Sequence, residues 1–350
     1  MRLNYAIYEE TYPDGFYPFS LVKPSSFIIY RYRKLIDWIK EEIGEISGHI
    51  APEYIINSYG LKEAKNYDVI INSRIKPGLI RQAVDQLKDG ESLWESNKLV
   101  AAKGSFHNTV KREVKGYLFE GLWEITSSLF SPPFEKSSIE GEVNKFALID
   151  DSRGPVIVEK GAKIEAMSVI YGPAYVSSGS VVSFAKVAAS YIGKNCRIGG
   201  ELERTVIEDF ANKVHFGFIG DSYVGSYSNL GAGTTTSNLK NTYGTVRVFN
   251  GREKIDTGKT KVGAFIGDFV RTSINTSIMS GKTLGPFSHV SGTVDNDITP
   301  FSFYEKPMNL EKVIEQTIRY FERKNAPIKS KIEELIKGAF SAFTGIKSQG

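Results

Sequence analysis

The sequence predicts an α/β N-terminal part, a left-handed parallel β-helix of hexapeptide repeats and C-terminal helices. Aliphatic residues recur at every sixth position in the second half of the chain. A six-residue period fits neither an α-helix nor an open strand, but it is typical of a triangular coil with inward aliphatic side chains. The first series is Val158, Ile164, Ile170, Val176 and Val182, and the second is Ile266, Thr272, Ile278, Leu284 and Val290, with one threonine.

A second observation supports the same coil. An Ile, Val or Leu is followed directly by Gly eight times in the second half of the chain. Glycine fits the corners of such a coil because it adopts backbone angles that other residues avoid. We expect the repeat region to run from about 141 to 294, with interruptions at 199–218 and 237–261. The second interruption is polar and rich in Gly, which favours a loop or hairpin that protrudes from one corner.

The flanking segments predict mixed structure. Before residue 130 we expect strands at 5–8, 68–71 and 99–102, and helices at 26–43, 77–87 and 117–130. Residues 308–345 are expected to form two helices that break near Ala326-Pro327 and cap the open end of the coil. A helix that binds a partner protein is the alternative interpretation of this segment.

Composition limits the classes of partner. The 350 residues carry 44 basic and 40 acidic side chains, a net charge of +4 that does not indicate nucleic-acid binding. The single cysteine, Cys196, cannot form a disulfide within one chain, which suits a reducing compartment. We see no signal-peptide pattern and no apolar run long enough to cross a membrane. We therefore expect a cytoplasmic protein without a nucleic-acid or membrane partner.

The residues most suited to chemistry lie between 213 and 238. His215 can act as a general base, and Asn229 and Asn238 can hydrogen-bond a polar ligand without charge. The run Gly231-Ala232-Gly233 leaves room for a thin ligand and offers backbone N–H groups to a developing oxyanion. In the alternative interpretation, His215 is a structural loop residue and the glycines only turn corners.

These motifs resemble a known family. The stretch from His215 to Thr234 resembles the acetyltransferase half of the bifunctional glucosamine-1-phosphate acetyltransferase/N-acetylglucosamine-1-phosphate uridylyltransferases. Residues 199–268 are more similar still to a shorter archaeal and bacterial branch that is described as sugar nucleotidyltransferase-like. The N-terminal part resembles that branch through Tyr17-Pro18-Phe19-Ser20 and Ile71-Asn72-Ser73-Arg74.

The resemblance implies an acetyl-CoA-dependent acetyltransferase that acts on an amino sugar or an amino-sugar phosphate in nucleotide-sugar metabolism. His215 would deprotonate the amine, and Asn229 and Asn238 would position the amine and the acetyl donor. The Ala232 N–H would receive the thioester carbonyl, and Lys306 would face the phosphates of coenzyme A. Proteins of this kind are typically homotrimers with active sites between neighbouring coils.

The chain departs from the family at several positions. Phe218 stands where the family has Tyr, and the family's sugar-phosphate arginine and lysine fall at Ala188 and Glu203. Because a phosphate needs cations or N–H donors, this puts a sugar-1-phosphate acceptor in doubt. Lys213 is our candidate for a compensating substrate contact; Lys186, Arg197 and Arg204 are others, and all four could instead be surface charges.

Residues 1–130 lack the Gly-x-Gly-x-Arg run of nucleotidyltransferases and are roughly half the usual length of that fold. We therefore expect a reduced nucleotidyltransferase-like domain at 1–130, the acyltransferase β-helix at 141–294 and a helical cap at 308–345. Mg²⁺ would be needed only if nucleotidyl transfer is retained, and no other metal site is predicted. A sugar-1-phosphate nucleotidyltransferase and a non-catalytic trimeric scaffold remain the alternatives.

Overall fold

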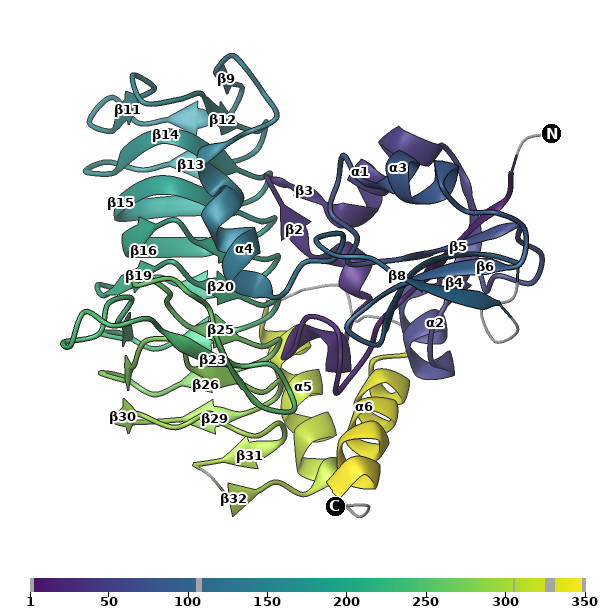
Figure 1. Ribbon diagram of the computed structural model, residues 1–350. Helices are drawn as coiled ribbons and strands as arrows, with labels where there is room; N and C mark the ends of the chain where they lie inside the picture. The colour runs from purple at the N-terminus through teal and green to yellow at the C-terminus, as the bar shows by residue number, and fades with distance from the viewer. Residues whose placement is uncertain (1–2, 105–108, 305, 325–330, 348–350) are drawn as a thin grey trace. The chain divides into compact units, whose positions relative to one another are not determined.

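The computed structural model describes residues 3–104, 109–304, 306–324 and 331–347, and it confirms the predicted fold class. The chain divides into two compact units. The first comprises Met1–Ile29, Arg33–Gly121 and Ile318–Gly350, and the second comprises Tyr30–Tyr32 and Leu122–Thr317. The second unit holds the repeat region and is drawn from teal to yellow-green in Figure 1.

The first unit contains a six-stranded mixed sheet with the order β4-β1-β5-β7-β6-β8. The central strand β1 runs parallel to β4 and β5, whereas β7 is antiparallel to both of its neighbours. The sheet therefore presents the carboxyl ends of five strands, all except β7, at one edge. Its strands are β1 (Tyr5–Tyr8), β4 (Ile46–Ile50), β5 (Val69–Asn72), β6 (Glu91–Glu95), β7 (Lys98–Lys103) and β8 (Val110–Glu113).

The helices of the first unit are shorter than the sequence predicts. The expected helix at 26–43 begins only at α1 (Leu35–Ile43), because Arg31 and Tyr32 adopt positive φ values of 45° and 67° in a turn between two short strands. Turns of this kind cannot continue a helix. The remaining elements are η1 (Phe19–Leu21), η2 (Ser25–Phe27), β2 (Ile29–Tyr30), β3 (Arg33–Lys34), α2 (Glu53–Tyr59) and α3 (Ile80–Asp85).

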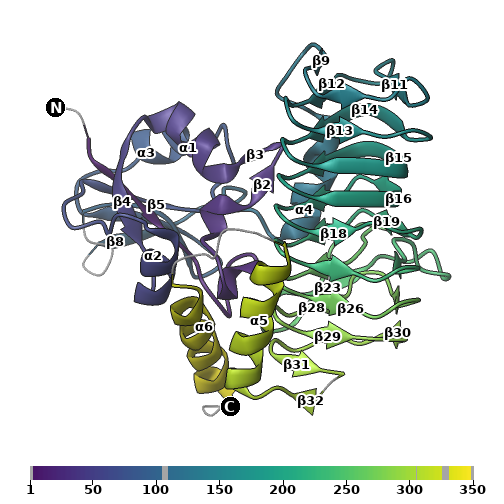
Figure 2. The same ribbon diagram turned by 180° about the vertical axis from the view of Figure 1, so that it is seen from behind.

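The second unit begins with α4 (Leu122–Ser127) and η4 (Ser128–Phe130) and then winds into a three-sided prism. Each coil pairs in parallel with the next, so strands that lie one coil apart stack into three faces (Figures 1 and 2). We number the faces in the order in which the chain visits them from β10 onward. Each edge between faces is named by the two faces that it joins.

Face 1 consists of β10 (Glu142–Val143), β13 (Lys163–Ile164), the first parts of β15 (Val181–Ile192) and β16 (Arg197–Glu203), β18 (Asn212–Lys213), β21 (Asn229–Leu230), β26 (Arg271–Thr272), β29 (His289–Val290) and β31 (Ser302–Phe303). Face 2 consists of β11 (Leu148–Asp150), the first part of β14 (Val169–Val176), the middle of β15, the end of β16, β19 (Phe218–Gly220), β22 (Thr235–Thr236), β27 (Ser277–Ile278) and β30 (Thr293–Val294). Face 3 consists of β9 (Ser138–Ile139), β12 (Val156–Val158), the ends of β14 and β15, β17 (Val206–Ile207), β20 (Tyr223–Val224), β25 (Phe265–Ile266) and β28 (Thr283–Leu284).

The predicted inward residues form the core of the prism. All ten members of the two six-residue series are buried, and nine of them belong to one aliphatic cluster that runs the length of the coil. The tenth, Thr272, accepts a 2.9 Å hydrogen bond from the Gly231 N–H. Burial of the aliphatic side chains is the main stabilising term of such a coil.

The two predicted interruptions differ in the structure. The coil continues through 199–218, which is a correction: Leu202 and Ile207 remain inside the prism, and only the spacing between inward residues changes. The segment 237–261 does leave the coil. It contains the antiparallel hairpin of β23 (Arg247–Phe249) and β24 (Lys254–Asp256), inserted at edge 2–3 between β22 and β25.

Edge 3–1 is formed by an aromatic stack. Its neighbouring rings are nearly coplanar, with interplanar angles of 7° to 11° and centroid separations of 4.7 to 5.2 Å. Each ring stands on a residue with positive φ, so the same left-handed corner recurs from coil to coil. The stacked residues are Phe210, Tyr227, Phe269, Phe287 and Phe301.

The C-terminal helices are α5 (Leu310–Lys324) and α6 (Ile332–Lys347). The sequence predicted that both would cover the open end of the coil. Instead, Val313 and Thr317 of α5 lie beside the aromatic stack at Phe269 and Phe287, and α6 packs against α2 within the first unit. The strand after the last coil, β32 (Lys306–Pro307), pairs antiparallel with β31. No helix among the described residues is long and apolar enough to span a membrane.

If the inward positions stabilise the prism, alanine substitutions at an inward and an outward position of β15 should differ in their effect on stability. Val182 points into the prism and is fully buried, whereas its neighbour Val181 lies on the outer surface. Val182→Ala should lower the free energy of unfolding by about 2 kcal/mol, because it removes buried methyl groups and leaves a cavity. Val181→Ala should cost less than half as much. Equal losses for the two variants in chemical denaturation would contradict the assignment of inward and outward positions.

Candidate active site

His215 lies on edge 1–2, in the turn at 214–217 that joins β18 to β19. The turn projects from the prism: His215 is exposed, and Phe216 is 69% exposed. In the preceding coil, Gly199 and Gly200 occupy this edge, and in the following coil residues 231–233 do so. The imidazole therefore stands between two coils whose edge residues are small.

Close approach of the backbone requires several of these glycines. A Cβ on Gly199 would come within 1.8 Å of the Val214 carbonyl oxygen, and one on Gly217 would come within 2.2 Å of the Thr234 carbonyl oxygen. Gly217 also has a φ of +125°, which other residues rarely adopt. The glycines thus both permit the coil to fold and keep the surface beside His215 free of side chains.

Ala232 presents the donor that the resemblance implied. Its carbonyl accepts a 2.7 Å hydrogen bond from the Asn275 N–H in the next coil. Within the described part of the chain, the Ala232 N–H has no acceptor, and the residue is half-buried. This N–H lies one coil away from His215 on the same edge, where it can meet a ligand carbonyl.

The backbone ladder of face 2 is interrupted beside the site, a feature that the sequence analysis missed. Between β19 and β22, threonine hydroxyls replace carbonyl acceptors: the Gly220 N–H donates to Thr236 Oγ1 at 3.2 Å and the Phe218 N–H donates to Thr235 Oγ1 at 3.4 Å. The three consecutive threonines at 234–236 were the available signal. On face 2, next to His215, the coils that contain β19 and β22 are therefore joined by side-chain hydrogen bonds.

Asn229 lies on face 1, one coil beyond Asn212. The Asn212 Nδ2 group donates a 3.1 Å hydrogen bond to Asn229 Oδ1. This contact orients the amide of Asn229 with its oxygen toward Asn212. Asn229 is half-buried, so a ligand on face 1 can reach it.

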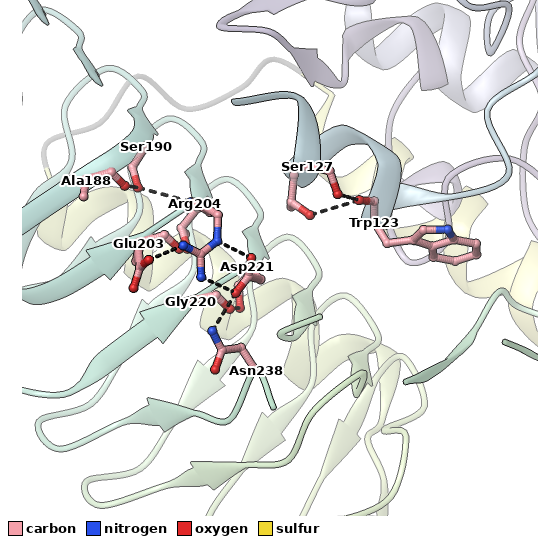
Figure 3. A network of polar contacts seen from close by, with 12 residues as sticks. Trp123, Ser127, Ala188, Ser190, Glu203, Arg204, Gly220, Asp221 and Asn238 are labelled. Carbon is pink, nitrogen blue, oxygen red and sulfur yellow. Dashed lines mark hydrogen bonds and ion pairs between the residues drawn. The ribbon is translucent and has the colours of Figure 1, made fainter. Parts of the chain in front are cut away.

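Asn238 belongs to a charged network on edge 2–3 (Figure 3). Arg204 donates to both carboxylate oxygens of Asp221, from Nε at 2.5 Å and from a terminal nitrogen at 2.9 Å, and Asn238 Nδ2 donates to Asp221 Oδ2 at 2.6 Å. The hydrogen bonds with Asp221 raise the pKa of Arg204. Asp221 therefore orients Asn238, a role that the sequence did not predict.

Lys213 lies inside the prism, not on its surface. It pairs with Ile198 of the preceding coil and is 1% exposed. Its ammonium donates to the carbonyl oxygens of Gly199, His215 and Phe216. Burial lowers the pKa of Lys213 to about 8. The predicted contact between Lys213 and a substrate is not supported by this placement, because its donors face the backbone.

Lys306 lies on β32, beyond the last coil. Five strand-to-strand steps along face 1 separate β18 from β32, which amounts to about 24 Å at the usual strand spacing. Lys306 is exposed there. It cannot touch the group that His215 touches, and only a long extended ligand along the prism axis would reach both.

The predicted site residues do not all converge in one chain. His215 and Ala232 share edge 1–2, whereas Asn229 lies on face 1 and Asn238 lies across face 2 on edge 2–3. Face 2 separates His215 from Asn238. Both edge 1–2 and face 2 separate Asn229 from Asn238. A ligand that contacts all three needs surfaces from more than one face.

Face 2 also carries a pocket of about 240 Å³ in the coils that precede His215. Ala188 and Glu203, which stand at the positions of the family's phosphate-binding cations, both line it. Lys186 forms a 2.7 Å ion pair with Glu201, and this hydrogen bond raises the pKa of Lys186. The pocket therefore has mixed charge and not the cationic lining that a phosphate requires. It is lined by Arg153, Tyr171, Lys186, Ala188, Glu201, Leu202 and Glu203.

The first unit has a buried polar cluster where β1, β4 and β5 end, the usual position of ligands in open α/β sheets. Glu9 accepts from His49 Nδ1 at 2.8 Å, and Glu10 forms a 2.5 Å ion pair with Arg74. All four side chains are buried, so they already occupy the position where a ligand of such a sheet would bind. Among the described residues, no group of three or more His, Cys, Asp or Glu side chains is arranged to hold a metal ion.

Comparison with known proteins agrees with the motifs. The bifunctional sugar-1-phosphate nucleotidylyltransferase/acetyltransferase of Sulfurisphaera tokodaii is 31% identical over 185 residues, 47% of this chain and 46% of that protein. The chain is a homologue of such bifunctional transferases. The bifunctional protein GlmU of Methanococcus maripaludis is 30% identical over 237 residues, 65% of this chain and 56% of that protein. The chain spans about half the length of the curated relatives that it matches, and no protein-family model matches it.

Comparison with solved structures found a putative acetyltransferase of Bacillus cereus, which is 13% identical with a TM-score of 0.29 and covers 57% of this chain and 98% of its own. PerB from Caulobacter crescentus, in complex with CoA and GDP-perosamine, is 11% identical with a TM-score of 0.18 and covers 85% of this chain and 91% of its own. These scores are too low to carry an argument, so the description of the prism rests on its own strand pairing.

Because the Arg204 network is mostly buried, replacing its carboxylate with an amide should lower the free energy of unfolding more than the same change in an exposed ion pair. Asp221→Asn removes the charge opposite a guanidinium that is 13% exposed, and we expect it to cost about 1–3 kcal/mol in the free energy of unfolding. Glu201→Gln breaks the ion pair with the exposed Lys186 and should cost no more than about 1 kcal/mol. A smaller loss for Asp221→Asn than for Glu201→Gln in urea denaturation would show that the network does not stabilise edge 2–3.

Proposed function

We propose that the protein is an acetyl-CoA-dependent acetyltransferase that acts on an amino sugar or an amino-sugar phosphate in nucleotide-sugar metabolism. The observation that carries the proposal is an exposed His215 between two coils with small edge residues, with the Ala232 N–H available one coil away. The homology to bifunctional sugar-1-phosphate nucleotidyltransferase/acetyltransferases supports the same reaction.

In the proposed reaction, the acceptor amine attacks the thioester carbonyl carbon while the His215 imidazole takes the proton that the nitrogen loses. A C–N bond forms, the C–S bond breaks, and the departing sulfur leaves as a thiol after it gains a proton. The Ala232 N–H would stabilise the negative charge that develops on the carbonyl oxygen. Lys306, farther along face 1, would meet the distal phosphates of the donor.

We further propose that the site operates in the cytoplasm, since the lone cysteine, Cys196, is buried inside the prism as a free thiol. Because the face 2 pocket has mixed charge, it favours an acceptor sugar that places no phosphate group in this pocket. Arg153 and Glu201 there offer donors and acceptors suited to sugar hydroxyls and an ammonium group.

His215→Asn should lower kcat for acetyl transfer by about 10²- to 10⁴-fold, because the amide cannot accept the proton from the amine. Tyr243→Asn, at an exposed residue of the inserted segment 237–261 to which no role is assigned, should leave kcat near that of the parent protein. The assay measures thiol release from acetyl-CoA with a panel of amino sugars and their 1-phosphates. Equal rates for His215→Asn and the parent protein, with circular dichroism unchanged, would exclude His215 as the base.

Edge 1–2 also supports a homotrimer. Large apolar side chains project from this edge in five of its coils, with exposed fractions from 42% to 72%, and the coils at Gly199-Gly200 and at residues 231–233 interrupt them. An apolar surface of this extent on a soluble protein marks an interaction site. The side chains belong to Phe146, Met167, Phe184, Val214, Phe216 and Ile274.

A threefold arrangement of parallel prisms with edge 1–2 toward the axis would bury this ridge, which comprises the six apolar side chains named above. Face 1 of each copy would then meet face 2 of the next. Asn229 of one copy would lie at the same coil level as Asn238 of its neighbour, with His215 one coil away on the edge. We propose that the active site is completed in this way by a second copy of the chain.

The trimer predicts that polar substitutions on the ridge separate the chains. Met167 and Phe184 both have positive φ, a conformation that Asn adopts more easily than most residues, so Met167→Asn with Phe184→Asn should preserve the backbone. The double variant should elute as a monomer in light-scattering chromatography at concentrations where the parent protein is trimeric. Tyr243→Asn, at an exposed aromatic residue with positive φ outside the ridge, is the control and should leave the mass unchanged. A trimeric double variant would contradict the proposed interface.

A further inference from the structure

The position of Lys213 in the coil is one that aliphatic residues otherwise occupy. Ile164, Val182 and Ile198 precede it on face 1, one per coil, and Leu230 follows it. Each of these side chains points into the prism and is almost fully buried. An ammonium group in such a place costs free energy unless hydrogen bonds replace the water that it loses.

All three hydrogen bonds of the ammonium go to backbone oxygens at edge 1–2. Gly199 O lies at 3.3 Å in the preceding coil, and the carbonyl oxygens of His215 and Phe216 belong to the exposed turn itself. The Phe216 oxygen also accepts from the Gly233 N–H of the next coil at 3.1 Å. The Lys213 side chain therefore joins the turn to the preceding coil, and the hydrogen bond from Gly233 joins the same turn to the following coil.

The hydrogen bonds of the turn show what the lysine supplies. The step from Lys213 to Ile219 has the usual six residues of this edge, as from Ile164 to Ile170 and from Leu230 to Thr236, whereas the preceding coil passes from Ile198 to Leu202 in four. Among the described residues, no backbone N–H donates to the carbonyl of His215. The Lys213 ammonium meets this carbonyl from inside the prism.

We propose that Lys213 is a positioning residue: it holds the backbone of the turn at 214–217 so that the His215 imidazole is presented at edge 1–2. The inference rests on the proposed acetyltransferase function, in which His215 is the base. Lys213 makes no contact with substrate in this account. Burial disfavours the charged form and lowers the pKa of Lys213 to about 8, and no neighbouring carboxylate offsets this effect.

The test compares Lys213→Met with Ile198→Met. Both variants place a methionine at an inward position of face 1, in adjacent coils, but only the first removes the hydrogen-bond donors. We expect Lys213→Met to fold with a denaturation midpoint no lower than that of the parent protein, because replacing a buried charge with an apolar side chain is often neutral or stabilising. We expect its kcat to fall about 100-fold, with little change in KM for either substrate, because the base is misplaced. Ile198→Met should retain kcat within about twofold, because it removes no hydrogen bond from the turn.

The split between kcat and KM separates positioning from substrate binding. If Lys213 contacted a phosphorylated acceptor directly, Lys213→Met would raise KM for that acceptor and leave reaction of the non-phosphorylated amino sugar unchanged. Such a result overturns the proposal. A kcat within about twofold of the parent value in folded Lys213→Met overturns it as well.

Hydrogen exchange provides a measurement that does not depend on activity. Amides of the turn at 214–217 should exchange about 10-fold faster in Lys213→Met than in the parent protein, while amides of neighbouring β20 are unchanged. Equal exchange of the turn overturns the proposal even where kcat falls. If the parent protein shows no acetyl transfer with any amino sugar, the proposed function fails, and the exchange result alone decides whether Lys213 holds the turn.

Discussion

Backbone pairing between successive coils is the constraint on which the rest of the structure depends. Because each strand of the prism pairs in parallel with the strand one coil away, residues at equivalent points of the coil stack in columns. The inward columns are aliphatic, edge 3–1 is an aromatic stack, edge 2–3 carries the Arg204 network and edge 1–2 carries an apolar ridge. Each column consists mainly of one type of side chain, so a residue of another type within a column is easily recognised.

The candidate site lies where several columns depart from their pattern in neighbouring coils. Lys213 replaces an aliphatic residue, glycines replace the large apolar side chains of the ridge on both sides of His215, and hydroxyls of Thr235 and Thr236 replace backbone acceptors. Each departure weakens a regular interaction of the coil. Their concentration around one exposed imidazole is the physical argument for function at that place.

Much of this architecture could be predicted from the sequence. The six-residue period identified the inward residues of two stretches, Val158 to Val182 and Ile266 to Val290, because a coil with a fixed repeat must bury the same position each time. The exposed position of His215 could not be deduced from that period, and its role stays a proposal. The hairpin at β23 and β24 was predictable as a protrusion from its polar, Gly-rich composition.

Other features could not be predicted, for physical reasons. The segment 199–218 was interpreted as an interruption because the period shortens there, although Leu202 and Ile207 still point inward. Lys213 was interpreted as a substrate contact, or else as a surface charge, because lysine is almost never fully buried without compensating partners. Its partners are backbone carbonyls, which leave no mark in the sequence. The turn at Arg31 and Tyr32 that shortens the expected helix depends likewise on backbone angles.

The central claim is that one active site uses face 1 of one chain and face 2 of the next, and mixing two inactive variants tests it directly. Asn229→Ala and Asn238→Ala should each be nearly inactive alone, because each site then lacks one of its amides. When the two proteins are unfolded together, refolded and assayed for acetyl transfer, random trimers should recover about a quarter of the parent activity, since about one interface in four pairs two unaltered faces. A mixture that stays as inactive as its components would contradict a site shared between chains.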